Sequence, residues 1–563
     1  AEENELWERA IEFYSRGAAQ YPGDSRFPWA LGSLYYSRRL YNLAWEQYRR
    51  VEALGPQDTD ILYRLSQTAG HLNWDWVSTE YLERILEIDP GNRESIGSLG
   101  WMYYKIHRPE EGERLLLDAM DRFGADADYA MTLGTIYSDM FRYEEAKSWY
   151  LAAIAGGEEL GDREFTAVAH YNLSILESRF YRFGLAFERT NASLNSRNRA
   201  SGRLARGELF LRRLDLPQTF AEYQAAYEID TSPLSKVNLA QAYQIAGRLE
   251  EARLYAEDCL NSKDLSWMIN YGIDPDRYKR DLHEILYITY EGLVKTQGRT
   301  VYASLGDRVR GFFRGWSYRV QAASHRRLYQ KYCLIVAGAY QAADPSAGER
   351  PDALIRYYNA FDSYPRRALT YLQKARQFEI PIIPQAESSY DAEEGILLKN
   401  TEQLAAAIPR LDPLWERDVI AGAYAELAPQ LAGKNRTAEA RDAVERLYAL
   451  NRGGLRQNGL TLPVELIINP GDGKDNPSRT ERVLRRTLKK MGVAADRAGD
   501  NPSRFRLTIT LSTGGGEQTA LCDLYDSGRG ISLFRRSAAL PSLSGADISA
   551  FARELGDALF TGN

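Results

Sequence analysis

Cysteine and histidine are scarce in this sequence of 563 residues, which contains 3 Cys and 5 His. The cysteines, Cys259, Cys333 and Cys522, lie far apart and form no Cys-x-x-Cys pair. Disulfide frameworks and zinc sites need closely spaced Cys or His residues. We therefore predict three isolated buried thiols, with no metal site and no cofactor.

The sequence also lacks a long apolar run and an excess of positive charge. Its best apolar stretch, residues 333–339, is far shorter than the roughly 20 residues that a membrane-spanning helix needs. The formal net charge is −6, whereas nucleic-acid binding requires a basic face. These two absences predict no transmembrane helix and no nucleic-acid partner.

The first residue is Ala1 and not Met. This is typical of a chain from which a signal peptide has been removed, or of a trimmed chain. The expected location is the bacterial periplasm or cell envelope, with the cytoplasm as the alternative.

The sequence does contain an internal repeat. A leucine followed by a small residue recurs at a constant spacing, and a second small residue and a large residue follow at constant distances in most units. Small residues allow two antiparallel helices to approach closely, and the large residue fills the seam between pairs. The spacing equals the period of about 34 residues that is typical of a helix–turn–helix repeat. The repeating leucines are Leu31, Leu65, Leu99 and Leu133.

This register resembles that of the tetratricopeptide repeat family over about residues 25–158. The resemblance implies a mainly α fold, an α-solenoid of helix–turn–helix pairs, because one pair alone buries too little apolar surface. Shifted units around Leu173 and Leu239 extend the predicted solenoid over residues 1–264.

Three further sections are predicted. Residues 265–350 form an irregular helical section with a basic amphipathic segment, and residues 351–458 form a degenerate helical section of the same repeat type. Residues 461–563 change character, because apolar residues alternate there with strand spacing at Leu462, Val464 and Leu466. The predicted order is β-α-β-β-β-α, a small C-terminal α+β domain.

The resemblance also implies a binding groove. In the family, the first helix of each pair lines the concave face, and members that bind peptides often carry Asn just before the leucine. Aromatic side chains give contact area at low entropic cost, and Asn can both donate to and accept from a peptide backbone. The predicted groove residues are Tyr36, Arg64, Gln67, Trp101, Tyr104, Tyr171, Asn172, Asn238 and Gln241.

A basic aromatic segment covers residues 299–331, with Asp307 as its only acidic residue. The pattern suits a core-packed helix with a solvated basic face, a helix that contacts an acidic partner or a second copy, or a helix on an anionic membrane. Its key residues are Arg308, Phe312, Phe313, Arg314, Trp316 and Arg319.

No catalytic constellation is recognised. Cys522 lies on a predicted strand without a base, and Gly471–Lys474 lacks the Ser or Thr that a phosphate-binding loop requires after its lysine. The sequence therefore predicts a non-catalytic scaffold or adaptor that binds peptides or helices of other proteins in its groove, in the assembly of a bacterial envelope complex. One alternative is a membrane-associated or chaperone-like factor acting through residues 299–331. The other is an enzyme with its active site in the C-terminal domain.

Overall fold

The computed structural model describes residues 2–55, 58–262, 275–297, 305–343, 365–469, 477–496, 503–514, 517–540 and 545–561. Predictions that concern residues 263–274, 298–304, 344–364 or 470–476 lie outside this description. The described chain folds as two compact units. The first holds residues 2–198 and 340–343, and the second holds the described residues of 199–263, 275–339 and 349–563.

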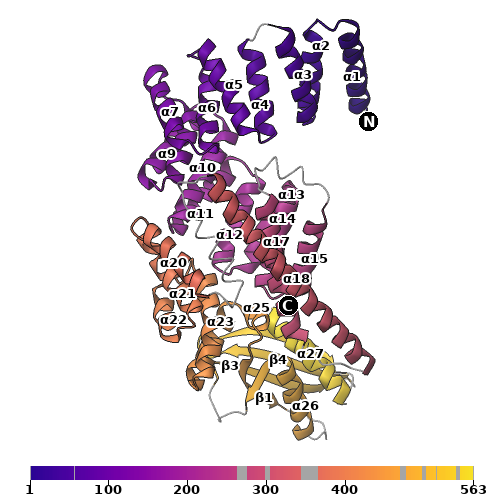
Figure 1. Cartoon of the computed structure of the whole chain (residues 1–563). Helices are drawn as coiled ribbons and strands as arrows, with labels where there is room; N and C mark the ends of the chain where they lie inside the picture. The colour runs from indigo at the N-terminus through magenta and orange to yellow at the C-terminus, as the bar shows by residue number, and fades with distance from the viewer. Residues whose placement is uncertain are drawn as a thin grey trace. The chain divides into compact units, whose positions relative to one another are not determined.

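The first unit consists of helices that follow one another side by side in chain order (Figure 1). The helices are α1 (Glu2–Gln20), α2 (Arg26–Ser37), α3 (Tyr41–Leu54), α4 (Thr59–His71), α5 (Asp75–Ile88), α6 (Arg93–Lys105), α7 (Pro109–Phe123), α8 (Ala127–Asp139), α9 (Tyr143–Glu159), α10 (Arg163–Arg179) and α11 (Phe183–Ser196). From α2 onward they form consecutive pairs, as the repeat predicts.

The repeat positions form the core of these pairs. The four leucines of the repeat register are buried, and where glycine follows the leucine, at Gly32, Gly100 and Gly134, it faces a large residue of the second helix. A Cβ added at Gly134 would lie 2.6 Å from the ring of Tyr150, and one at Gly100 would lie 2.7 Å from Leu116. Only glycine permits this approach, which confirms the predicted role of the small residue.

In each helix pair, the turn between the two helices contains one residue with a positive φ. Arg39, Asn73, His107 and Phe141 have φ between 57° and 59° and recur with the spacing of the repeat. Two residues of the second unit, Lys399 (φ 49°) and Asn435 (φ 60°), occupy equivalent turns. In each turn the next backbone N–H bonds to a carbonyl five residues earlier, as from Arg108 to Tyr103 and from Arg436 to Leu431, which satisfies a carbonyl at the helix end.

The second unit continues with helices and ends in a sheet. Its helices before the sheet are α12 (Ala200–Arg212), α13 (Leu216–Ile229), α14 (Pro233–Ile245), α15 (Leu249–Asn261), α17 (Pro275–Gln297), α18 (Leu305–Ala343), α20 (Pro365–Glu379), η1 (Pro384–Ala386), α21 (Glu387–Leu397), α22 (Thr401–Ala407), η2 (Ile408–Arg410), α23 (Arg417–Gly433), α24 (Thr437–Leu450) and α25 (Arg452–Gln457).

The sheet has the strand order β2-β1-β3-β4-β5, in which β1 pairs in parallel with β2 and β3, while β4 pairs antiparallel with β3 and β5. The elements are β1 (Leu462–Asn469), α26 (Pro477–Lys490), β2 (Val493–Asp496), β3 (Phe505–Gly514), β4 (Glu517–Asp526), β5 (Ile531–Leu540) and α27 (Gly545–Thr561).

The predicted order β-α-β-β-β-α lacks one strand, β2. Its four residues are too few to show an alternating pattern, and it exists as a strand because it pairs with β1, beginning at Leu462 opposite Val493. The fold class, a helical-repeat solenoid followed by a small α+β domain, is as predicted.

Candidate functional site

The first unit carries a groove of about 790 Å³ formed mainly by the first helices of successive pairs, with Tyr150 added from the second helix α9. Asn92, Asp126 and Asp162 cap the N-termini of α6, α8 and α10 through side-chain hydrogen bonds and so fix where each wall begins. We call it the α6–α8–α10 groove. Its lining includes Tyr63, Arg93, Glu94, Ser98, Trp101, Asp126, Asp128, Met131, Thr132, Thr135, Ser138, Asp139, Val168, Asn172, Ile175 and Arg179.

The middle of the groove is largely apolar. Trp101, Met131, Val168 and Ile175 line it, and Trp101 and Ile175 expose 39% and 46% of their surfaces. The Asn172 side chain donates from Nδ2 to Met131 Sδ at 3.3 Å, and among the described residues its carbonyl oxygen has no hydrogen-bond donor. This surface suits an apolar side chain of a partner, with Asn172 available to a backbone N–H.

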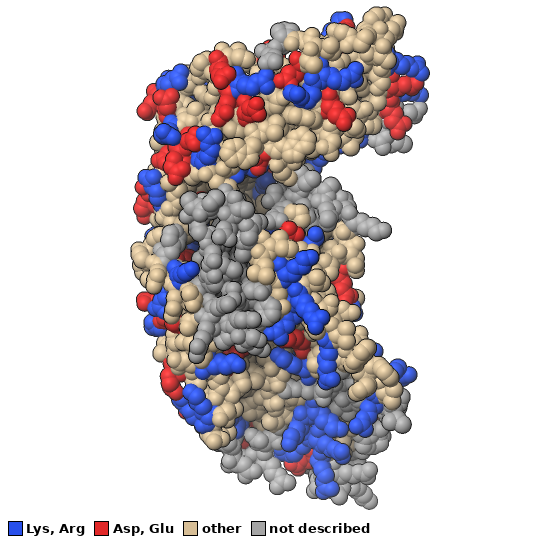
Figure 2. Space-filling view, viewed as in Figure 1, with Lys and Arg blue, Asp and Glu red and all other residues tan. Residues whose placement is uncertain are grey.

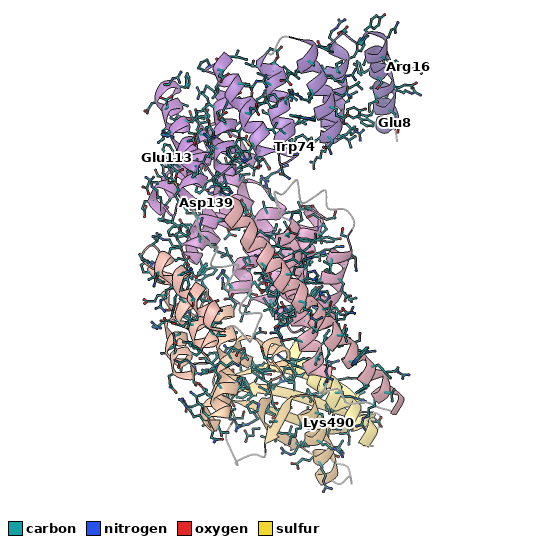
Figure 3. The ribbon with its side chains drawn as sticks, in the orientation of Figure 1. Glu8, Arg16, Trp74, Glu113, Asp139 and Lys490 are labelled. Carbon is teal, nitrogen blue, oxygen red and sulfur yellow. The ribbon has the colours of Figure 1, made fainter. Side chains whose placement is uncertain are left out.

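The end of the groove at the helix C-termini is held by an ionic network. Arg179 Nη1 lies 2.9 Å from Asp139 Oδ1 and donates to the Ser138 carbonyl at 3.0 Å. Tyr104 Oη donates to Asp139 Oδ2 at 2.5 Å, and burial followed by the Asp139 charge raises the pKa of Tyr104. Asp139 is labelled in Figure 3. Because the charges of Asp139 and Arg179 offset each other, this pair adds no net charge to this end of the groove.

The end at the helix N-termini is acidic. Arg93 Nη2 lies 3.1 Å from Asp126 Oδ2, so one basic side chain faces the three acids Glu94, Asp126 and Asp128. Burial, and then the charges of Asp126 and Asp162, raise the pKa of Asp128. A cationic group of a partner would relieve that repulsion.

The structure brings together only some of the predicted groove residues. Trp101 and Asn172 line the groove, and Tyr104 supports its wall through Asp139. Tyr171, half-buried on α10, is outside the lining set.

The other predicted groove residues are engaged elsewhere. Tyr36 lies 3.0 Å from His71 Nε2, and Arg64 Nη1 donates to Gln67 at 3.4 Å. In the second unit, Asn238 donates from Nδ2 to Leu234 O of its own helix at 2.9 Å, and Gln241 lies half-buried on the same helix. Whether any of them binds a partner stays a prediction.

Sequence reasoning missed the contribution of α8 to the groove. The register that selects Trp101 from Leu99 also selects Thr132, Thr135 and Ser138 around Leu133, and all three line the groove. The repeat register did not point to Arg179, because its partner Asp139 lies 40 residues earlier in a unit of different length.

The basic aromatic segment forms the first part of α18. Phe312, Phe313 and Trp316 are among the most exposed large apolar side chains of the described chain. Arg308, Arg314 and Arg319 are exposed beside them.

The described C-terminal residues hold no reactive thiolate. Burial raises the pKa of Cys522 to about 12, and Asp526 is engaged by Arg504 Nε at 2.8 Å. Across the described ranges no group of three or more His, Cys, Asp or Glu side chains is placed to hold a metal ion. No helix in those ranges is both long and apolar enough to cross a bilayer.

Two family models, each described as a tetratricopeptide repeat, match residues 127–155 and 235–262. No curated protein matches the sequence.

Several solved structures are similar in part. PilF of Pseudomonas aeruginosa is 17% identical, with 38% of this chain and 96% of that chain covered and a TM-score of 0.31. PilW, described as a type IV pilus biogenesis factor, is 14% identical, with 41% and 100% covered and a TM-score of 0.32. Human IFIT1, solved as a dimer with the oligonucleotide PPP-AAAA, is 12% identical, with 73% and 90% covered and a TM-score of 0.36.

Proposed function

We propose that this chain, which is a tetratricopeptide-repeat protein, is a non-catalytic interaction scaffold that binds a short segment of another protein in the α6–α8–α10 groove. The observation that best supports this proposal is the groove itself. Its middle is apolar and exposed, and its walls are helices with capped N-termini. The setting that goes with this proposal is a bacterial envelope complex, with the cytoplasm as the alternative.

The apolar middle supplies the binding free energy in this account. Fully burying a large apolar side chain of the partner contributes about 1.5–3 kcal/mol, and the exposed parts of Trp101 and Ile175 are available to cover it. Because the walls are already fixed by caps and by the Asp139–Arg179 ion pair, little ordering of the groove opposes binding. A preformed surface of this kind favours an anchored peptide or helix.

The ends of the groove set the direction of the segment. The end at Glu94, Asp126 and Asp128 carries more negative than positive charge, whereas Asp139 and Arg179 neutralise each other at the other end. A segment with an apolar anchor followed by a Lys or Arg side chain matches this arrangement.

Peptides selected on the full chain from a random display library test the proposal. For such peptides we expect Ile175→Glu and Trp101→Ser each to weaken binding by about ten- to hundred-fold, equivalent to about 1.5–3 kcal/mol, as measured by isothermal titration calorimetry.

Leu151→Glu is the matched control, because Leu151 is 38% exposed on α9 and lies outside the groove lining. It should leave the Kd unchanged. Equal loss in all three variants, or loss in none, would place the binding surface elsewhere. Circular dichroism spectra that match the wild type show that each variant has folded.

A further inference from the structure

The first part of α18 presents an apolar stripe to solvent. Val309, Phe312, Phe313, Trp316 and Val320 are 49%, 68%, 63%, 60% and 48% exposed. At about 100° of rotation per residue these five positions fall within about 100° of arc on the helix. We call them the α18 stripe.

The opposite side of α18 is anchored to the second unit. Tyr318 Oη donates to Glu250 Oε1 at 2.6 Å, and Tyr329 Oη donates to Glu284 Oε1 at 2.9 Å. Ala322 and His325 are buried on this side. These contacts fix the rotation of the helix about its axis. The α18 stripe therefore faces away from the second unit and is not part of its apolar core.

Arginines lie on both flanks of the α18 stripe. By the same rotation Arg310 and Arg314 fall on one side, and Arg308 and Arg319 on the other. Within the described ranges Arg308, Arg314 and Arg319 form no ion pair. Figure 2 shows Lys and Arg side chains gathered where Figure 1 draws α17 and α18. Glu291 and Lys295 of α17 line the same hollow as Arg319, so this hollow contains one acidic side chain among several basic ones.

This geometry matches an anionic lipid surface. A helix that lies in the plane of a bilayer buries a narrow apolar stripe, and its flanking arginines extend to the phosphate level while their stems cover apolar surface. A projecting stripe with cations on both sides suits a flat, negatively charged surface. From the apolar arc, the flanking arginines and the anchored reverse side we infer that α18 docks this protein peripherally on anionic membranes. This function is separate from peptide binding in the α6–α8–α10 groove.

Flotation of the full chain with vesicles tests the inference. In about 20 mM salt we expect the chain to float with vesicles of phosphatidylcholine and phosphatidylglycerol, and to bind pure phosphatidylcholine vesicles at least ten-fold more weakly. The double variant Phe312→Ser/Trp316→Ser should lose at least ten-fold in vesicle affinity. Arg308→Gln/Arg314→Gln should bind more weakly at low salt and respond less to added salt.

Leu254→Ser is the matched control, because Leu254 is 55% exposed on α15 of the same unit. It should float like the wild type. Absence of flotation at low salt would overturn the inference, as would equal binding to neutral and anionic vesicles. So would a dimer in sedimentation velocity that Phe312→Ser/Trp316→Ser abolishes, since the α18 stripe would then be covered by a second copy. All variants change exposed side chains, so failure to fold is not expected, and peptide binding in the groove reports separately on the first unit.

Discussion

At the scale of single residues, tyrosine, glutamate and arginine join one repeat to the next. Tyr137 Oη donates to Glu113 Oε1 at 2.6 Å, and the guanidinium of Arg142 lies 4.4 Å from the centre of the Tyr137 ring. Burial, and then the hydrogen bond to Glu113, raise the pKa of Tyr137 to about 12. Glu113 is labelled in Figure 3.

The same arrangement occurs one repeat earlier in the chain. Tyr103 Oη donates to Glu83 at 2.8 Å, and Arg108 lies 4.8 Å from the Tyr103 ring. Because the hydroxyl, the carboxylate and the guanidinium satisfy one another, each joint fixes the packing of neighbouring pairs. Such joints connect α5 to α6 and α7 to α8, and so hold successive pairs of the first unit in register.

A pair of buried histidines joins α18 to α17. His283 Nδ1 and His325 Nδ1 are 2.9 Å apart, and this contact requires a proton on only one of the two nitrogens. Burial, followed by the positive charges of His325 and Lys279, lowers the pKa of His283 from 6.5 to about 4.

The pair predicts a loss of stability in acid. Between pH 6.5 and about 4 the unfolded chain binds a proton at His283 that the folded chain does not, so stability is fully present above pH 6.5 and falls as the pH is lowered through this window. From pH 7 to pH 5 we expect a loss of at most about 2 kcal/mol from this residue, measured by urea unfolding.

His283→Phe should lose less stability over the same pH change, because phenylalanine keeps the ring stacked on Tyr332 and does not titrate. His107→Asn is the control, since His107 is an exposed turn residue with φ 59°, a conformation that Asn tolerates. An acid loss in His283→Phe equal to that of the wild type would contradict this assignment.

At the scale of elements, the repeat depends on close approach at glycine. We expect Gly134→Ala to destabilise the protein by about 1–3 kcal/mol, because the added Cβ would lie 2.6 Å from the Tyr150 ring. Gly184→Ala is the matched control within helix α11, where an added Cβ meets nothing within 4 Å, and it should be neutral or slightly stabilising. Urea unfolding of both variants measures the difference. Equal stability of the two variants would show that the packing between α8 and α9 at Gly134 leaves more space than this distance implies.

The elements also show what local sequence can and cannot predict. Leu99 and Gly100 were predictable, because their burial recurs with the period of the repeat. The extra residues between Leu133 and Leu173 appear in the sequence as an interruption, but the structure accommodates them by lengthening α9 and α10 to 17 residues each. Gly156 lies inside α9, where an added Cβ would lie 2.8 Å from Ala127 Cβ, and so it is a packing residue and not a break.

The sequence alone could not predict contacts between residues that lie far apart in the chain. Trp101 and Asn172 followed from the register of the repeat, whereas the ion pair of Asp139 with Arg179 and the pair of His283 with His325 join residues 40 and 42 positions apart. Neither pair has a local pattern, because each depends on how whole helices pack.

At the scale of the whole molecule, the C-terminal sheet shares its core with the helices before it. Tyr448 of α24 donates to the Leu559 carbonyl at 2.7 Å, and its ring contacts Phe505 of β3 with ring centres 5.0 Å apart. Glu445 accepts hydrogen bonds from Ser503 Oγ and Arg504 N. A chain cut after residue 458 would expose this core, so binding experiments need the full chain.

Both binding surfaces must therefore be tested on the intact chain. The α6–α8–α10 groove lies in the first unit and the α18 stripe in the second. A scaffold that binds a protein segment with one unit and an anionic membrane with the other would concentrate that partner at the membrane. Of the two proposals, peptide binding in the groove is the central one.

Site-specific photocrosslinking in living cells tests that claim most directly. A benzophenone side chain would replace Trp101 in the groove or, as the control, Leu151 outside it, always in the full chain. We predict one discrete protein adduct from position 101 that disappears when Ile175→Glu is added, and no such adduct from position 151. The same adduct from both positions, or an adduct at position 101 that survives Ile175→Glu, would contradict the account and show that the groove is not where this protein binds its partner.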